Sequence, residues 1–386
     1  MTATIELSEQ LSRNNNPCAP AGHTETPEVS IELRGAADAL AVMSLWKDIA
    51  AKFQPGRLAC SWEWTQTWLD HYGDLIPHRF AIGRQQGHIC GLCLLTEGVD
   101  QREGPFGVKS LHVGTAGEPE RDSVCVEYNC LPVQERHQAE FLRALSETVA
   151  REPGWDEFCF DGFRAEEVEQ LSWGDDDAAY RNSKSHYFDL QSTRDASAEP
   201  LSRLGYATRK NIRKNLKAYG KLKTEWADTE DEAVSIFSDM VRLHQARWDA
   251  AGRPGAYASE RFMNFHRALI RQLLPLNKVG LFRVSRDEEI VGCVQLFIDG
   301  NRALCYQGGS APYEGKRSPG LIVDYLCIEE CLRRGYDAYD FLCGDSHHKR
   351  KLTTDFNRIV WVRQRRRRLK FVAVDLVRKL KSLLHR

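Results

Sequence analysis

The sequence predicts an α/β protein in which one order of helices and strands occurs twice. Each half begins with helical segments, continues with three short strands joined by tight turns, and ends in alternating helices and strands. The chain has 386 residues, which is enough for two domains that each bury a core. The repeated order, without close sequence identity between the halves, implies two similarly folded units.

The composition is typical of a globular protein, with 42% hydrophobic and 28% charged residues. Because no apolar run approaches the length of a membrane span and the N-terminus lacks a secretory pattern, we expect a cytoplasmic protein. Because the net charge is only -1, a charged partner is not attracted by the protein as a whole and must bind to a local patch. The only close cysteine pair, Cys90 and Cys93, supplies half a zinc site, so we expect reduced thiols and no metal.

The first half follows a polar segment, residues 1–28, that we expect to be a flexible tail. Helical periodicity predicts a helix over 36–53 and a second one that Ser61 caps. Strands are predicted over 78–85, 88–98 and 108–117, then a helix over 137–152, a strand over 155–163, a helix over 165–172 and a strand over 184–192. Trp62, Trp64 and Trp68 have the spacing of core anchors, with a stacking platform as the alternative.

The second half begins after the polar run 191–200, which is typical of a domain boundary. Helices are predicted over 201–220, 230–252 and 259–275, strands over 279–286, 289–300 and 301–309, a helix over 318–334, and strands over 337–344 and 358–365. The order of the first half is thereby repeated.

The stretch 306–325 carries a candidate anion site. A strand ends in paired glycines, a loop contains Lys316 and Arg317, and an apolar helix follows. Backbone N–H groups and the helix dipole at such a junction suit a pyrophosphate. Ser318 and Pro319 are equally typical of an ordinary helix start, and the spacing matches neither of the common phosphate-loop patterns. The residues alone leave both interpretations open.

Several motifs occur in a characteristic succession: LGYATRKNIRKNLK (204–217), LHQARWDAAGRPGAY (243–257), RSPGLIVDYLCIEECLRRGYDAYDFLCG (317–344), HHKRKLT (347–353), SWEWTQTWLDHYG (61–73) and EYN (127–129). Together with the order of elements they resemble the GNAT acyltransferase superfamily, in its CelD/FemAB-like branch with a doubled fold. The resemblance implies two tandem GNAT-like domains, each with a mixed, mainly antiparallel sheet flanked by helices. Their expected bounds are 29–190 for a degenerate first domain, 191–200 for a linker, 201–368 for the acyltransferase domain and 369–386 for a basic amphipathic helix.

In this superfamily an acyl thioester of coenzyme A lies between the fourth and fifth strands, with its pyrophosphate over the loop that starts the third helix. The resemblance therefore implies acetyl-CoA or another acyl-CoA as co-substrate, bound by Tyr306, Gly308, Gly315, Lys316, Arg317, Ser318 and Gly320. Pro319 departs from the usual glycine-rich signature because it removes one N–H donor. The first half has no comparable run, so we expect it to help shape the acceptor pocket.

Acyl transfer to an amine requires a base, donors for the developing oxyanion and an acid for the leaving thiolate. Asp345, His347 and His348 follow the strand predicted over 337–344, where α/β sheets present reactive groups. We expect His348 to act as base or acid, with Asp345 and His347 beside it. Relatives often carry Tyr at the position of His348, and Tyr313 is the alternative acid. Surface exposure is the other interpretation of these histidines.

We expect the acceptor to contact His244, Arg247 and Trp248, because His244 and Trp248 lie on one helical face. If this face points outward, the three residues are ordinary surface. Lys349 and Asp340 are the remaining candidate substrate residues. Lys349 contacts substrate or phosphate in one interpretation and pairs with Asp340 in the other.

Two basic runs, 203–217 and 363–370, are typical either of solvated faces or of phosphate binding. The terminal segment places Phe371, Val374, Val377, Leu380 and Leu384 on one face and Lys370, Arg378, Lys379 and Lys381 mostly elsewhere. Such a helix either lies in an anionic membrane interface or packs on its own domain.

The leading hypothesis is an acyl-CoA-dependent N-acyltransferase that acts on an amine, such as an amino sugar or an envelope or exopolysaccharide precursor. The second hypothesis is a Fem-type ligase that uses aminoacyl-tRNA and binds it through the basic run 203–217, although no long helical arm is predicted. The third is a non-catalytic double-GNAT protein of polysaccharide assembly. Nucleic acid is expected as a partner only under the second hypothesis.

Overall fold

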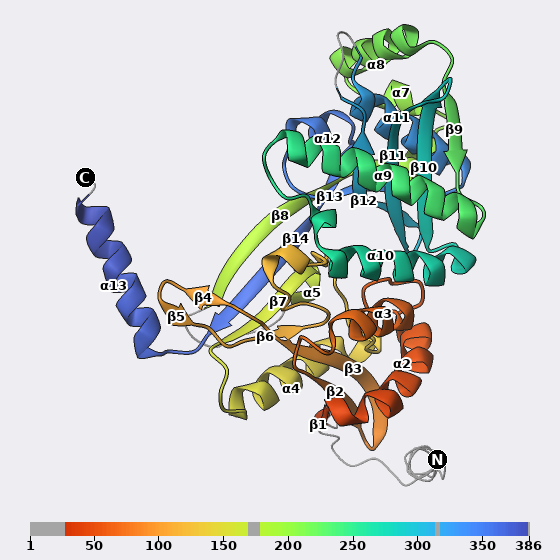
Figure 1. Cartoon of the computed structure of the whole chain (residues 1–386). Coiled ribbons are helices and arrows are strands. Elements are labelled where there is room, and N and C mark those ends of the chain that lie inside the picture. The colour runs from red at the N-terminus through yellow and green to blue at the C-terminus, as the bar shows by residue number, and fades with distance from the viewer. Residues whose placement is uncertain (1–27, 169–177, 313–316, 385–386) are drawn as a thin grey trace, which may run out of the picture.

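The computed structural model describes residues 28–168, 178–312 and 317–384 (Figure 1). The predicted tail up to residue 27 and the candidate residues Tyr313, Gly315 and Lys316 lie outside the described residues. Two layers of helices cover one continuous sheet, which confirms the predicted class of a mixed, mainly antiparallel α/β fold.

The sheet has twelve strands, and all neighbouring pairs are antiparallel except β6–β7 and β12–β13. In spatial order they are β1 (Ser30–Gly35), β2 (His78–Gln85), β3 (His88–Glu97), β6 (Ser110–Val113), β7 (Glu157–Arg164), β14 (Asp355–Arg365), β8 (Ala178–Asp189), β13 (Ala338–Cys343), β12 (Arg302–Ser310), β11 (Glu289–Asp299), β10 (Val279–Arg286) and β9 (Lys223–Trp226). A separate hairpin is formed by β4 (Arg102–Glu103) and β5 (Phe106–Gly107).

Two long strands at the centre of the sheet join the halves. β14, the last strand of the chain, pairs with β7 of the first half, and β8 of the first half pairs with β13 of the second (Figure 1). β8 and β14 also pair with each other, from Asp355 opposite Tyr187 to Gln364 opposite Ala178. Each half therefore completes its sheet with a strand from the other half, whereas the sequence pattern places the strand over 358–365 in the second half alone.

The helices are α2 (Ala39–Phe53), α3 (Trp62–Tyr72), α4 (Gln138–Arg151), α5 (Ala165–Val168), α6 (Leu190–Asp195), α7 (Pro200–Arg203), α8 (Tyr206–Tyr219), α9 (Glu230–Ala250), α10 (Glu260–Leu273), α11 (Pro319–Arg333), α12 (His347–Lys351) and α13 (Leu369–Leu384). Short 3₁₀ turns occupy Ala36–Asp38, Glu120–Asp122, Glu135–His137, Ala256–Ala258 and Leu274–Leu276. The predicted helix over 201–220 divides into α7 and α8 because Leu204 and Gly205 have extended backbones. The predicted domain bounds stay predictions, and their linker contains most of α6 and the first residue of α7.

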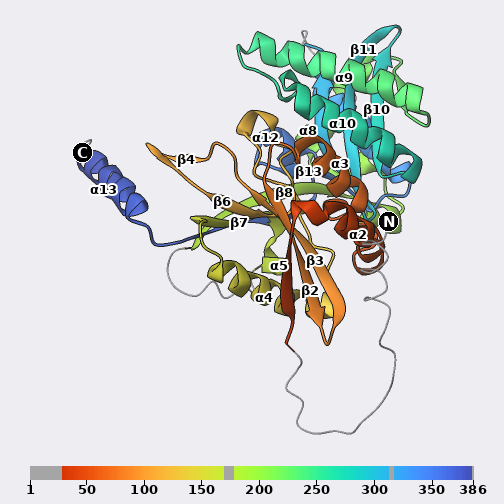
Figure 2. The same cartoon turned by 60° about the horizontal axis from the view of Figure 1, so that its bottom comes forward.

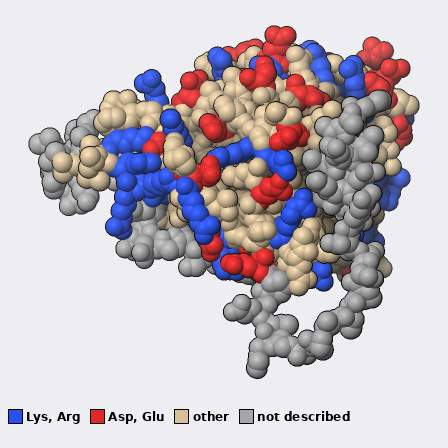
Figure 3. Space-filling view, turned by 90° about the horizontal axis from the view of Figure 1, so that it is seen from below, with Lys and Arg blue, Asp and Glu red and all other residues tan. Residues whose placement is uncertain are grey.

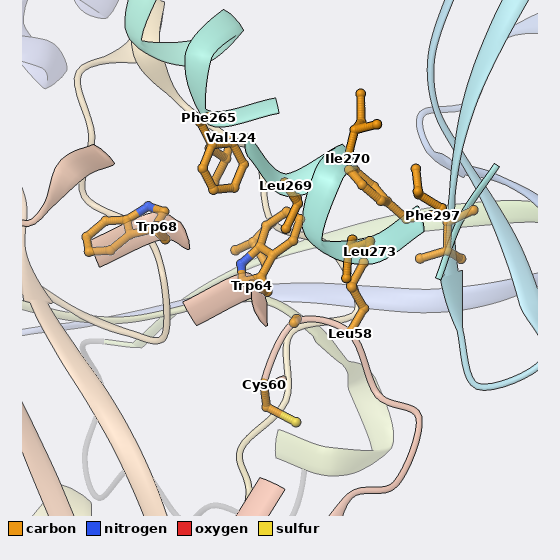
Figure 4. Close-up of a cluster of buried hydrophobic side chains, with 14 of the residues drawn as sticks. Leu58, Cys60, Trp64, Trp68, Val124, Phe265, Leu269, Ile270, Leu273 and Phe297 are labelled. Carbon is orange, nitrogen blue, oxygen red and sulfur yellow. The ribbon is translucent and has the colours of Figure 1, made fainter. Parts of the chain in front are cut away.

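One apolar core is shared by the two halves (Figure 4). Trp64 and Trp68 of α3 are buried, and the edge of the Trp64 ring system meets Phe265 of α10 at 5.4 Å and Phe297 of β11 at 5.7 Å between centroids. The Trp64 indole N–H donates to Thr115 Oγ1 at 2.7 Å, so the indole nitrogen is satisfied despite its burial. The two tryptophans are thus core anchors, and their packing holds residues of both halves in a fixed relation.

Candidate active site

The parallel strands β12 and β13 separate after a short paired stretch. They pair from Arg302 opposite Ala338 to Leu304 opposite Asp340, and no further. On its other side β12 contains a bulge at Tyr306, since Gln295 faces Gln307 and Leu296 faces Cys305. A bulge bends its strand, which accounts for the divergence. The Tyr306 hydroxyl donates to the Val124 carbonyl at 2.6 Å and holds the bulge against the first half.

The helix α11 begins beyond the end of β12, at the predicted anion site. The Ser318 N–H donates to Oδ1 of the buried Asn215 at 2.6 Å, which ties the helix start to α8. The Arg317 guanidinium lies 5.5 Å from the centroid of the Tyr219 ring. Of the described residues, the nearest to a Cβ on Gly320 would be Ser310, with its Oγ at 3.8 Å.

A cavity of about 1430 Å³ reaches from the opening between β12 and β13 into the space between the two halves. Cys305, Tyr306, Phe341 and Leu342 line it on the side of the two strands. The loop that contains Pro119 to Glu127 and the start of α10 line the opposite side. A second cavity of about 730 Å³ lies in the first half, and both cavities are lined by Ser123, Cys125, Glu127 and Cys343.

Glu127 lies where the two cavities meet. Its Oε2 accepts a hydrogen bond from the Cys343 backbone N–H at 2.6 Å, so a carboxylate of the first half is fixed to the end of β13. Burial raises the pKa of this carboxyl above its ordinary value, although Lys349 opposes the shift. The sequence indicates Glu127 only as part of the EYN motif, because nothing in its spacing shows that the fold brings it to residue 343.

The backbone around Glu127 is held in an unusual conformation. Cys125, Tyr128 and Leu342 have φ angles of 45°, 56° and 60°, in the left-handed region that non-glycine residues rarely adopt. The ammonium of Lys349 donates to the carbonyls of Leu342 at 3.0 Å and Cys343 at 2.6 Å. Strained backbone that surrounding bonds hold in place is characteristic of functional sites.

Asp340 is a structural residue in this geometry. It is 0% exposed, and its carboxylate accepts from the Tyr128 hydroxyl at 2.5 Å, the Arg302 guanidinium at 2.8 Å and the Ser185 hydroxyl at 2.6 Å. The Leu342 backbone N–H donates a fourth hydrogen bond, to Asp340 Oδ1 at 2.8 Å. These bonds occupy the carboxylate, so Asp340 is unavailable to substrate. The alternative pairing with Lys349 is also absent, because the described contacts of that ammonium are carbonyls.

His348 lies beside α11 and does not line the cavity. Its Nε2 is 2.6 Å from Asp324 Oδ2, and its ring meets the Phe341 ring edge-on at 6.3 Å. The hydrogen bond to Asp324 raises the pKa of His348, with burial opposing it. Asp345 instead contacts His186 at 3.2 Å and Arg350 at 2.9 Å, and both His347 and His348 are exposed. The structure thus separates the three residues that the sequence groups into one catalytic set.

The His348–Asp324 pair predicts a pH-dependent contribution to stability. A raised folded pKa means that this contribution is complete below about pH 6.5 and is lost as the pH rises through the raised value. We therefore expect His348→Gln to lower the melting temperature more at about pH 5.5 than at about pH 8.5. Thermal scans at both pH values measure this, with the exposed neighbour His347→Gln as control. An equal decrease in the melting temperature of His348→Gln at both pH values would show that the His348–Asp324 pair does not make this pH-dependent contribution.

The predicted acceptor residues of α9 lie behind the cavity wall. The Trp248 indole N–H donates to His244 Nε2 at 3.0 Å, and burial lowers the pKa of His244. Both Trp248 and Gln245 pack against Gly255, which does line the cavity. Arg247 is exposed and is not in the lining. His244 and Trp248 therefore support the wall from behind, whereas Arg247 is ordinary surface.

In the first half, the equivalent opening between β6 and β7 is filled. These strands pair from Ser110 opposite Glu157 to Val113 opposite Phe160. Beyond that point the buried Asn129 donates from Nδ2 to the carbonyls of Val113 at 2.9 Å and Asp161 at 3.1 Å. Gly162 is required because a Cβ there would lie 2.3 Å from the Val126 carbonyl oxygen. Only the second half therefore has an open slot between its diverging strands.

The doubled sheet with one open slot defines a class of protein, the tandem GNAT fold. Residues 207–350 match the family described as acetyltransferase (GNAT) domain. A crystal structure of FemX is similar over 82% of this chain and 95% of its own, at 12% identity and a TM-score of 0.53. The chain thus shares the fold of FemX, and the GNAT-like domain that the sequence predicts matches in the second half.

Two further structures share less of the geometry. A tandem GNAT protein from the clavulanic acid biosynthesis pathway is 13% identical, with 86% of this chain and 98% of that chain covered and a TM-score of 0.42. A conserved protein of unknown function from Bacteroides thetaiotaomicron is 13% identical, with 84% and 97% covered and a TM-score of 0.48. No curated protein matches the sequence. Among the described residues, no group of three or more His, Cys, Asp or Glu gathers as a metal site would require.

Proposed function

We propose that the chain is an acyl-CoA-dependent N-acyltransferase with an amine as acceptor. The carrying observation is the opening between β12 and β13. The start of α11 lies near the end of β12, where a Cβ on Gly320 would be 3.8 Å from Ser310 Oγ, and Glu127 lines the cavity that the opening enters. An acyl-CoA supplies a thioester, whose acyl group is activated for transfer. The match of residues 207–350 to an acetyltransferase domain supports this assignment.

The start of α11 and the open edge of β12 hold the co-substrate in this proposal. Arg317, Ser318 and Gly320 lie at the N-terminus of a 15-residue helix, whose dipole favours phosphate. Because the Ser318 N–H already donates to Asn215, Ser318 offers its hydroxyl and Gly320 its backbone N–H. Tyr306 and Gly308 belong to the part of β12 that β13 no longer pairs with, so its backbone can meet a thioester carbonyl.

Glu127 is the general base in this proposal. Burial raises its pKa toward neutrality, which makes the carboxylate a better proton acceptor than an exposed one. The Cys343 backbone N–H positions this carboxylate, and Glu127 lines both cavities. His348 is less suited to the role because it lies outside the lining and already pairs with Asp324.

The charge of the cavity favours a cationic acceptor. Six carboxylates line it against three Arg or Lys side chains: Asp70, Asp74, Glu120, Asp122, Glu127 and Glu260 against Arg121, Arg261 and Lys349. A cavity with excess negative charge attracts a protonated amine, which Glu127 then deprotonates. An amino sugar or another amine-bearing envelope or exopolysaccharide precursor fits both the charge and the volume of this cavity.

Binding of acetyl-CoA, longer acyl-CoAs and free CoA, measured by calorimetry, tests this proposal. We expect binding by the wild-type protein and a loss of at least about tenfold in Gly320→Trp, because the indole fills the space over the helix start. Gly320→Ala is the matched control, since its Cβ would contact only Ser310 Oγ at 3.8 Å. The absence of heat with every thioester would refute the proposal, as would unchanged binding by Gly320→Trp.

One observation favours the aminoacyl-tRNA alternative. Lys210, Arg213, Lys214 and Lys217 are exposed on α8, next to the start of α11. Exposed cations along a helix neutralise nucleic-acid phosphates. The alternative requires a tRNA complex that weakens steeply with salt and with Lys214→Glu, whereas the main proposal requires neither.

A further inference from the structure

The terminal helix α13 extends away from the body of the protein (Figures 1 and 2). Its first turns are fixed on one side, where Phe371 and Val374 are buried. A Cβ on Gly104 would lie 3.7 Å from Val374 Cγ2, and Lys370 Nζ donates to the Gly107 carbonyl at 2.7 Å. The inner side of α13 therefore rests on the β4–β5 hairpin.

The opposite side of α13 presents apolar side chains to solvent. Leu369, Val372 and Leu376 are 88%, 63% and 59% exposed, and their i, i+3, i+7 spacing forms one stripe along the helix. Phe106 at the tip of the hairpin is also exposed. The sequence places Phe371 and Val374 on the main apolar face, but in the structure these two face inward and the stripe lies on the other side. A cluster of large exposed apolar side chains marks an interaction surface.

The surroundings of the stripe are positively charged. Between residues 363 and 381 the sequence has nine Lys or Arg side chains and one carboxylate, Asp375. Ion pairs with Glu103, Asp156 and Glu157 offset only part of this positive charge. In Figure 3, Lys and Arg gather at the left of the molecule, the side from which α13 extends.

We propose that α13 and the tip of the β4–β5 hairpin dock on an anionic membrane surface. Leu369, Val372 and Leu376 enter the interface between headgroups and acyl chains, while the cations at the helix base meet the anionic headgroups. A nucleic acid would use the cations and leave the apolar stripe in water, so the combination favours lipid. Among the described helices, none has the length and apolarity to cross a bilayer, which fits a helix lying on the surface.

Cosedimentation of the full chain with vesicles tests this inference. We expect binding to phosphatidylglycerol–phosphatidylcholine vesicles to exceed binding to pure phosphatidylcholine by at least about tenfold and to weaken with salt. The double variant Val372→Ser, Leu376→Ser should lose at least about tenfold in partitioning. Leu40→Ser with Val234→Ser is the matched control, because both residues are exposed apolar positions on other helices.

Three outcomes would overturn the inference. The first is an equal recovery of the chain with anionic and neutral vesicles. The second is equal vesicle binding by the wild-type protein and the double variant. The third combines two results: the wild-type protein does not bind vesicles, and it forms a dimer in sedimentation velocity that the double variant does not form. The stripe would then bind a second copy of the chain. None of these readouts depends on acyltransferase activity, so the inference and the proposed function fail independently.

Discussion

Replacing Glu127 by glutamine is expected to lower kcat by about 10²–10⁴-fold, the usual contribution of a positioned general base. The amide retains an oxygen that accepts the Cys343 N–H but cannot take a proton from the amine. Acetyl-CoA affinity should stay within about twofold, because the loss falls on the chemical step. Release of free CoA thiol in the presence of amino-sugar acceptors measures the effect.

The pH profile distinguishes a base from a structural carboxylate. Because burial raises the pKa of Glu127, wild-type kcat/KM should rise with pH through that raised value, and the variant should lack this limb. Glu120→Gln is the control, since Glu120 is exposed in the lining of the same cavity. Unchanged turnover in Glu127→Gln would remove this residue from the chemistry and require another base.

Replacing Asp340 by alanine is expected to destabilise the protein by about 3–5 kcal/mol, as for the removal of one partner of a buried ion pair. The change leaves the Arg302 guanidinium without its carboxylate and removes the acceptor of the Tyr128 and Ser185 hydroxyls. The Leu342 N–H loses its partner as well, so the strained turn beside Glu127 is released. Urea unfolding followed by circular dichroism measures the loss.

The control for this substitution is Asp337→Ala, three residues earlier. Asp337 is partly exposed and pairs with Arg194 at 3.4 Å, so its replacement should change the free energy of unfolding by less than about 1 kcal/mol. If the two variants were equally stable, Asp340 would not be the structural centre that its four hydrogen bonds indicate.

Much of the fold could be predicted from local sequence patterns. The hairpin strands β10 and β11 carry apolar runs on both sides of a turn at Asp287, and Ser259 caps α10 through the Phe262 N–H. Two edge strands, β1 and β9, are not evident because six and four residues give too little periodicity. The partner of β14 could not be predicted either, since strand pairing depends on the whole sheet.

The candidate site was only partly predictable, because its chemistry combines distant residues. The junction of β12 with α11 is local, and its glycines and cations indicate a binding loop. Glu127 meets Cys343 across 216 positions of sequence, and no spacing rule reports such a contact. The hydrogen-bond partner of His348 is Asp324 of α11. The expectation that Asp345, its neighbour in sequence, would pair with it was wrong, because Asp345 pairs with Arg350.

The exchange of β8 and β14 also has a consequence for the time course of synthesis. β7 gains its neighbour β14 only when residues 355–365 have left the ribosome. Until then the first half has an unpaired strand edge in the middle of its eventual sheet. The first half therefore cannot complete its sheet before β14 is synthesised, although domains commonly fold in order from the N-terminus. A nascent chain that stops before residue 355 therefore lacks the strand that joins β7 to β8.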